Sequence, residues 1–323
     1  MPPGPEPTFS VVVAAYQAES TVSEAVKSAL QQTYPALEVI VCDDGSTDGT
    51  ADALTSFGDA ITVIRQDNRG ESAAKNRAVG QARGDYVVVL DADDVFLPRR
   101  LEALAWLATR HPDLDVLVTD AVVEADGEPM RRAYHPGWPF PTTDQRAAIL
   151  DRNFVLGLCA VRRRVWVDAG GFDPQLAYAA DWEFWQRLIF RGSRVGLVDE
   201  PLARYRLTRG TLSSHRIHLV QARLEVLSRA GRWDSLSPEE RAVLTWAIGR
   251  ERRNLAHRMA NESLDRGGWP ARREFAKIVL GRGFGLRTRL GALFAVASPA
   301  LAARRRRGRA DGMVEIGAGL RVR

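Results

Sequence analysis

The sequence predicts an α/β fold: a doubly wound, mostly parallel sheet followed by a helical C-terminal region. Apolar β-branched runs alternate with helical patterns over the first 120 residues, which is typical of βαβ units. From about residue 213 onward the pattern is almost purely helical. An apolar fraction of 45% in 323 residues also allows a sizeable core, so a folded chain rather than a disordered one is expected.

Continuous apolar runs identify the strands, because strands of a parallel sheet are buried on both faces. The predicted strands are 9–15, 37–42, 61–65, 86–90 and 115–119. Helices are expected between them at 21–32, 49–57, 71–82 and 98–110. Thr21 and Glu24 have the spacing of a capping box, Asp48 is placed to cap the second helix, and Pro98 favours the start of the fourth.

Residues 120–203 have a less regular pattern. Asp126-Gly127 favours a tight turn and therefore a hairpin. Further elements are expected as a helix at 145–151, a strand at 155–161, a helix from 163 and a helix at 179–190. The predicted domains are a disordered N-terminus at 1–8, an α/β domain at 9–212, a helical region at 213–285 and an apolar, basic tail at 286–323.

The net charge of +5 hides an asymmetry between the two parts of the chain. Residues 1–203 contain 19 Lys/Arg and 30 Asp/Glu, whereas residues 204–323 contain 26 and 10. The basic part is suited to anionic lipid, a phosphorylated substrate or nucleic acid, or is simply a solvated helical face. No recognition motif accompanies the charge, so no specific nucleic-acid partner is expected.

Three features predict a cytoplasmic protein. The two cysteines, Cys42 and Cys159, form no C-x-x-C pair, which fits a reducing compartment. The Pro-rich start lacks the apolar segment of a signal peptide, and no run reaches the roughly 18 apolar residues of a membrane span. The segment 286–309 is apolar and ends with five arginines among six residues. It is predicted to lie on an anionic membrane surface; a helix packed on the domain with a disordered basic tail is the alternative.

Carboxylates follow two of the predicted strands. Asp43 and Asp44 come after the second, and Asp91, Asp93 and Asp94 come after the fourth. Ligands of open α/β sheets bind at such strand ends. Acidic clusters there repel unless a cation lies between them, and a divalent ion with oxygen ligands is the simplest candidate. The first strand is followed by neither G-x-G-x-x-G nor a Walker lysine, so a metal would have to neutralise any bound phosphates.

Several ordered blocks resemble the family 2 glycosyltransferases over roughly residues 9–213. These blocks are SVVVAAY (10–16), SALQQTYP (28–35), EVIVCDDGSTDGT (38–50), NRG (68–70), AKNR (74–77), GDYVVVLDADD (84–94), GGFD (170–173), DWE (181–183) and RYR (204–206). The resemblance implies a GT-A fold and a hexosyltransferase of the kind that builds cell-surface polysaccharides. It also implies transfer, with inversion, of a sugar from a nucleotide-diphosphate donor, with a UDP-sugar favoured.

The resemblance also implies roles for individual residues. Asp93 would bind Mg²⁺ or Mn²⁺, and Asp181 would be the general base on the acceptor hydroxyl. The residues implied to bind the nucleotide sugar are Ala15, Tyr16, Glu19, Asp44, Asp91 and Ala92. The acceptor would be a glycan, a lipid-linked intermediate or a small molecule. A single carboxylate base suffices for one in-line displacement, and a metal ion stabilises the departing diphosphate.

Two positions depart from the family pattern, and other interpretations stay open. Ala180 stands where many members have a glutamate, and Thr208 where many have a histidine. These changes are the best support for one alternative, a catalytically silent relative that binds a nucleotide sugar or a partner, whereas the retained Asp91, Asp93 and Asp181 speak against it. A nucleotidyltransferase is a further alternative, although residues 15–20 lack its usual glycine-rich basic loop. Without the resemblance, Asp181 would be interpreted as a solvated helix N-cap.

Overall fold

The computed structural model describes residues 6–125, 127–207, 216–266, 268–281, 283–299, 302, 315–316 and 320–321. Two compact units are formed: residues 1–149 with 153–209, and residues 150–152 with 210–323. Thr208 and the arginine run at 304–309 lie outside the described residues. No described helix is long and apolar enough to cross a membrane.

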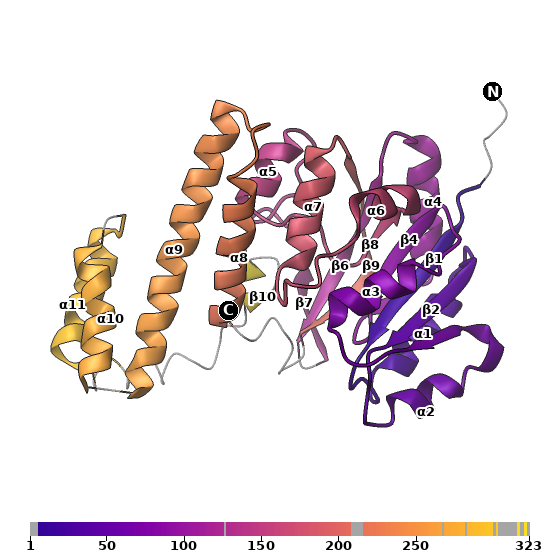
Figure 1. Ribbon diagram of the computed structural model, residues 1–323, viewed down its shortest axis with the longest axis horizontal. Coiled ribbons are helices and arrows are strands. Elements are labelled where there is room, and N and C mark those ends of the chain that lie inside the picture. Colours follow the sequence, from indigo (N-terminus) through magenta and orange to yellow (C-terminus); the bar gives the residue numbers. More distant parts are fainter. Residues whose placement is uncertain are drawn as a thin grey trace. The chain divides into compact units, whose positions relative to one another are not determined.

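A nine-stranded sheet forms the centre of the first unit (Figure 1), with the order β3-β2-β1-β4-β8-β6-β9-β5 and β7 paired to β6. Its strands are β1 (Phe9–Ala15), β2 (Glu38–Asp43), β3 (Thr62–Arg65), β4 (Tyr86–Asp91), β5 (Val95–Phe96), β6 (Val116–Ala125), β7 (Glu128–Arg132), β8 (Cys159–Arg162) and β9 (Val195–Leu207). The helices are α1 (Val22–Leu30), α2 (Thr50–Thr55), α3 (Glu71–Val79), α4 (Arg100–Arg110), α5 (Gln145–Asp151), α6 (Arg163–Ala169) and α7 (Ala180–Phe190), with a 3₁₀ turn at Gly58–Ala60.

The parallel half of the sheet places the predicted site residues together. β1 pairs in parallel with both β2 and β4, so that Ala15 lies opposite Asp43 and Ala14 lies opposite Asp91. The carboxyl ends of these three strands therefore meet at one edge. β8 runs antiparallel between β4 and β6, and β6 pairs in parallel with β9. The expected mostly parallel, doubly wound sheet is thus confirmed, with antiparallel additions.

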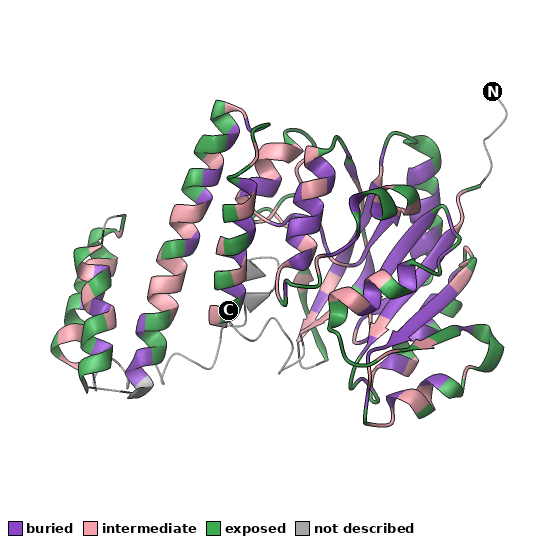
Figure 2. Cartoon of the chain, in the orientation of Figure 1, coloured by how far each residue is buried: buried purple, intermediate pink, exposed green. Residues whose placement is uncertain are grey.

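The core of this unit lies where the strand residues are continuously apolar. Val11, Val12 and Val13 of β1 and Val87 to Leu90 of β4 are fully buried, and these strands are purple along their length in Figure 2. α3 packs against β1 and β2, and α4 against β6 and β9. Both cysteines are free and buried.

Several element predictions need correction. The predicted capping box does not form: Thr21 makes no capping side-chain hydrogen bond, and the Glu24 carboxylate pairs with Arg206 instead. The strand expected at 155–161 is confined to Cys159–Arg162. The helix expected at 71–82 ends at Val79. The strands β5 and β9 were not predicted. The hairpin near Gly127 is confirmed by the pairing of β6 with β7.

The second unit is mainly helical, as predicted. Its elements are α8 (Arg216–Ala230), α9 (Pro238–Arg266), α10 (Gly268–Leu280), α11 (Leu286–Ala297) and the short strands β10 (Glu315–Ile316) and β11 (Leu320–Arg321). The last three helices share a small apolar core. Its buried residues are Ala260, Leu264, Ala271, Phe275, Ile278, Ala292 and Ala295.

Candidate active site

The loop after β1 and the loop after β2 are bound to each other at the edge of the sheet. The backbone carbonyl of Ala15 accepts a hydrogen bond from the Asp44 N–H at 2.8 Å. Gln17 has a positive φ of 50°, and its side-chain oxygen accepts hydrogen bonds from the N–H groups of Thr47 and Asp48. Next to Ala15, Tyr16 is 52% exposed. The structure thus presents an exposed aromatic ring beside a firmly held loop.

Glu19 and Asp44 are both occupied by contacts within the protein. The Glu19 carboxylate accepts a hydrogen bond from the Gly49 N–H at 3.2 Å. Asp44 is buried, and its Oδ1 accepts hydrogen bonds from Gln66 Nε2 at 2.7 Å and from the Arg69 N–H at 2.9 Å. Its Oδ2 accepts a single bond, from the Gly70 N–H at 2.8 Å. These bonds hold the loop that precedes α3. Because a carboxylate oxygen can accept from two donors, Oδ2 of Asp44 keeps one free acceptor position.

Lys75 of α3 provides the positive charge beside the second acidic cluster. Its side chain is buried, and its Nζ lies 2.6 Å from Asp91 Oδ1 and also contacts the Glu71 carboxylate. Burial opposes the charge on this amine, but the carboxylates of Asp91 and Glu71 raise the pKa of Lys75 above its ordinary value. The sequence predicts a cation between the carboxylates, and for Asp91 the protein itself provides one, the Lys75 ammonium group.

The next two aspartates have no such partner. Burial, followed by the charge of Asp91, raises the pKa of Asp93 to about 6. Asp94 is buried, and its Oδ1 accepts a hydrogen bond from the Arg206 N–H at 2.7 Å, while its Oδ2 has no partner. Burial and the charges of Asp91 and Asp93 raise the pKa of Asp94 well above normal. Ala92, between the first two aspartates, is 9% exposed.

A divalent cation fits this arrangement. Asp93 is a half-buried carboxyl beside another carboxylate, and in the described part of the chain no lysine or arginine forms an ion pair with it. The described residues contain no group of three or more His, Cys, Asp or Glu side chains suited to hold a metal. A hard cation such as Mg²⁺ is commonly bound by one or two carboxylates together with substrate phosphates. The protein therefore offers part of a ligand set that a diphosphate would complete.

Asp181 lies in the first turn of α7, behind Ala179 with its positive φ of 56°. Its Oδ1 accepts a hydrogen bond from the Trp182 N–H at 2.7 Å, and its Oδ2 accepts one from Asn153 Nδ2 at 2.8 Å. Burial raises the pKa of Asp181, and the two hydrogen bonds and the charge of Lys75 oppose this rise. Such an oriented carboxylate with a raised pKa is suited to accept a proton.

The side chains of Tyr205 and Lys75 interact electrostatically with the four aspartates at the end of β4 or the start of α7. Burial raises the pKa of Tyr205, and the charges of Asp94, Asp91, Asp93 and Asp181 add to the rise. The charge of Lys75 acts on Asp91, Asp93, Asp94 and Asp181 alike. Residues from β4, α7 and β9 are thereby brought into one electrostatic neighbourhood.

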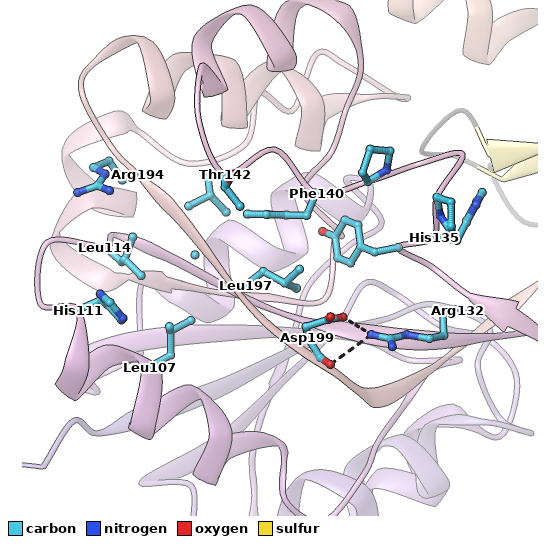
Figure 3. Close-up of a pocket in the computed structure, with 15 residues that line it drawn as sticks. Leu107, His111, Leu114, Arg132, His135, Phe140, Thr142, Arg194, Leu197 and Asp199 are labelled. Atoms are coloured by element: carbon cyan, nitrogen blue, oxygen red, sulfur yellow. Dashed lines mark hydrogen bonds and ion pairs between the residues drawn. The ribbon is translucent and has the colours of Figure 1, made fainter.

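Two cavities flank this region in the first unit. A polar one of about 830 Å³ begins next to Asp44 and is lined by Gly45, Gln66, Asp67, Asn68 and three arginines, Arg65, Arg69 and Arg77. A more apolar one of about 900 Å³ lies over the start of β9. Figure 3 shows Phe140, Leu197 and the ion-paired Arg132 and Asp199 around it. None of the residues predicted to bind donor, metal or proton lines this second cavity.

Sequence reasoning missed several residues of the site. Asn153, Gln17 and Asn76 hold other site elements through side-chain hydrogen bonds. Lys75, Asn76 and Tyr205 lie within blocks that resemble the family, but the sequence predicts no role for them. The Glu71–Lys75 spacing of four residues indicates an ion pair on a helix. No sequence signal indicates that Asn153 contacts Asp181, because the contact spans 28 residues without regular periodicity.

Comparison with known proteins agrees with this geometry. The model of the family described as glycosyl transferase family 2 matches residues 10–170. A putative teichuronic acid biosynthesis glycosyltransferase, TuaG of Bacillus subtilis, is 28% identical over 215 residues, which are 65% of this chain and 83% of that protein. The matches to two further bacterial glycosyltransferases span 66% and 44% of their lengths.

Two solved structures share the fold. S. aureus TarS 1–349 in complex with UDP-GlcNAc superimposes with a TM-score of 0.62 at 18% identity, covering 94% of this chain and 92% of that one. The mannosyltransferase PcManGT of Pyrobaculum calidifontis, in complex with GDP-Man and Mn²⁺, gives a TM-score of 0.59 at 21% identity, covering 96% and 89%. With residues 10–170 matching the family model and the GT-A architecture present, the chain belongs to glycosyl transferase family 2.

Proposed function

We propose that this glycosyltransferase transfers a sugar from a nucleotide-diphosphate donor to a hydroxyl acceptor, with inversion and with the help of Mg²⁺ or Mn²⁺. The observation that carries the proposal is the meeting of two carboxylate groups around Lys75. Asp91, Asp93 and Asp94 come from the end of β4, and Asp181 comes from the start of α7. One group is suited to a cation and a diphosphate, and the other to a proton acceptor.

On the donor side, Asp93 would hold the metal and Asp91 would remain paired to Lys75 near the sugar or ribose. When bound, the metal supplies Lewis-acid stabilisation of the negative charge on the leaving diphosphate. Ala15, Tyr16, Glu19 and Asp44 would border the nucleoside, and the free acceptor position on Asp44 Oδ2 suits an N–H of the base. Arginines of the adjacent polar cavity attract an anionic donor.

On the acceptor side, Asp181 would take the proton from the attacking hydroxyl. Asn153 and the Trp182 N–H fix the orientation of this carboxylate. Burial favours its neutral form, which increases its basicity. A single displacement with inversion requires the base and the attacking hydroxyl on one face of the anomeric carbon and the leaving group on the opposite face.

The identity of the donor base and the acceptor class are part of the proposal. TarS is bound to UDP-GlcNAc and PcManGT to GDP-Man, so both uridine and guanosine donors occur on this fold. We favour a UDP-sugar. TuaG is named for teichuronic acid biosynthesis, which supports a glycan or lipid-linked acceptor in cell-surface polysaccharide synthesis.

A thermal-shift screen of nucleoside diphosphates and their sugars tests this proposal. The wild type, Asp93→Ala and a control, Asp59→Ala at an exposed position on the 3₁₀ turn, are compared with Mn²⁺ or with EDTA. A ligand at 100 times its Kd stabilises a protein by about 2.7 kcal/mol. We expect one nucleotide to raise the Tm with Mn²⁺ in the wild type and control but not in Asp93→Ala. A folded wild type that responds to no nucleotide would contradict the donor site and would favour a catalytically silent relative that binds a partner through its basic C-terminal part.

A further inference from the structure

Helix α11 is apolar on two opposite sides, and only one of them is covered in the described residues. Ala292 and Ala295 are buried in the small core with α9 and α10. On the other side, Leu286, Leu290 and Leu293 are 75%, 58% and 52% exposed. These three leucines, here called the α11 stripe, follow a spacing of four and three residues and therefore lie along one face of the helix.

Exposed leucines in this arrangement are unusual for a helix in water. An apolar stripe on a helix is normally packed against other elements, and contiguous exposed apolar surface marks an interaction site. Neighbouring large apolar side chains are exposed as well: Trp269 at the start of α10 is 75% exposed and Leu280 at its end is 83% exposed. Figure 2 shows exposed residues along both helices.

The charge around the stripe distinguishes between the possible occupants. Of the described residues between 268 and 299, five are Lys or Arg and one is Asp or Glu, and Arg272, Arg273 and Arg287 are exposed. A second copy of the same surface would bring like charges together, which disfavours self-association. Nucleic acid would suit the charge but would leave the leucines in water. An anionic lipid surface satisfies both features, since leucines enter the acyl boundary and arginines remain near the headgroups.

We propose that the α10–α11 hairpin is a monotopic membrane anchor that inserts the α11 stripe into an anionic bilayer surface. Twelve residues of helix rise only about 18 Å, against a hydrocarbon core of about 30 Å, so α11 lies along the surface. The proposed anchor places the membrane contact of the expected interfacial segment at three named leucines of a packed helix. It concerns location and is independent of the proposed reaction, because binding to vesicles is read without donor or acceptor.

Vesicle flotation of the full chain tests the anchor. The wild type is compared with the triple variant Leu286→Ser, Leu290→Ser, Leu293→Ser and with a matched control, Leu37→Ser, Val63→Ser, Val167→Ser. The control removes three similarly exposed apolar side chains from the first unit. The vesicles contain phosphatidylcholine with or without phosphatidylserine. Circular dichroism and size-exclusion chromatography with light scattering report on folding and oligomeric state.

We expect the wild type and control to float with phosphatidylserine vesicles in a salt-sensitive way, and poorly with phosphatidylcholine alone. The stripe variant should bind at least about tenfold more weakly because it removes most of the apolar area that enters the bilayer. Equal flotation of the stripe variant would overturn the proposal, as would wild-type binding that does not depend on phosphatidylserine. A wild-type dimer that the stripe variant converts to a monomer, without flotation in either case, would assign the stripe to a second copy.

Discussion

At the scale of single residues, the environment of Asp181 balances burial against two hydrogen bonds. Burial favours the neutral carboxyl, whereas the Trp182 N–H, Asn153 and Lys75 favour the carboxylate, and the resulting pKa is raised. The donors therefore favour the ionised carboxylate, which is the form that can accept a proton. Asn153 is therefore a positioning residue for Asp181.

We predict that turnover declines as the pH falls, because protonation removes the base. Asn153→Ala deletes a donor that stabilises the ionised form of Asp181, so its pKa should rise further and the acidic limb should move to higher pH. The measurement is kcat against pH at saturating donor. Asn254→Ala, on α9, is the control and should keep the wild-type profile. An unchanged acidic limb in Asn153→Ala would show that Asp181 does not limit the rate.

Only part of the site is predictable from the sequence at this scale. Asp93 and Asp181 are predicted as site residues from their positions, one after a buried strand and the other before a helix, together with the family blocks. The burial of Lys75 and its contact with Asp91 depend on how α3 packs on β1 and β2. That packing is a tertiary effect, and no local pattern reports it.

At the scale of elements, Asn76 joins α3 to the segment that leads toward Asp181. Its Nδ2 donates a hydrogen bond to the Phe172 carbonyl at 2.7 Å, and its Oδ1 accepts one from the Phe172 N–H at 2.9 Å. Gly171 has a φ of 70°, and a Cβ there would lie 2.3 Å from Asn76 Oδ1. The close approach therefore requires glycine, and the two hydrogen bonds tie α3, which carries Lys75, to the segment before α7.

We predict that Asn76→Ala lowers the free energy of unfolding by about 1–3 kcal/mol, because it leaves two backbone groups of Phe172 without partners. Urea denaturation measures this change. Arg77→Ala, on the exposed side of the same helix, serves as the comparison and should alter stability by no more than about 0.5 kcal/mol. Equal stabilities of the two variants would mean that the bridge contributes little.

The element predictions succeed and fail for identifiable reasons. β1 has the predicted bounds because its residues form one mostly apolar run, of which all but Ala14 are buried. β9 was missed because Asp199, Glu200 and Pro201 interrupt its apolar pattern, and the ladder to β6 accommodates them by shifting register near Asp120. The capping box fails because Arg206, at the far end of β9, binds Glu24, and a contact over 182 residues is invisible to local reasoning.

At the scale of the whole molecule, the charge asymmetry matches the two proposals, one for each unit. The acidic residues of the first unit include the cluster at the ends of β2 and β4, where we propose that a divalent cation binds. The basic residues of the second unit accompany exposed leucines on α11. The alternation of strands and helices was sufficient to predict the fold class. The antiparallel insertion of β8 between β4 and β6 could not be predicted from this alternation, because pairing order depends on long-range contacts.

Parallel measurement of donor binding and turnover tests the central claim, that one site binds a metal–nucleotide donor through Asp93 and activates the acceptor through Asp181. Calorimetric titration with the donor and Mn²⁺, and release of nucleoside diphosphate, are compared for the wild type, Asp93→Ala and Asp181→Asn. We predict that Asp181→Asn binds donor within about twofold of the wild type but turns over at least about 100-fold more slowly. Asp93→Ala should lose metal-dependent binding. Wild-type turnover by Asp181→Asn, or unchanged metal-dependent binding by Asp93→Ala, would contradict the account.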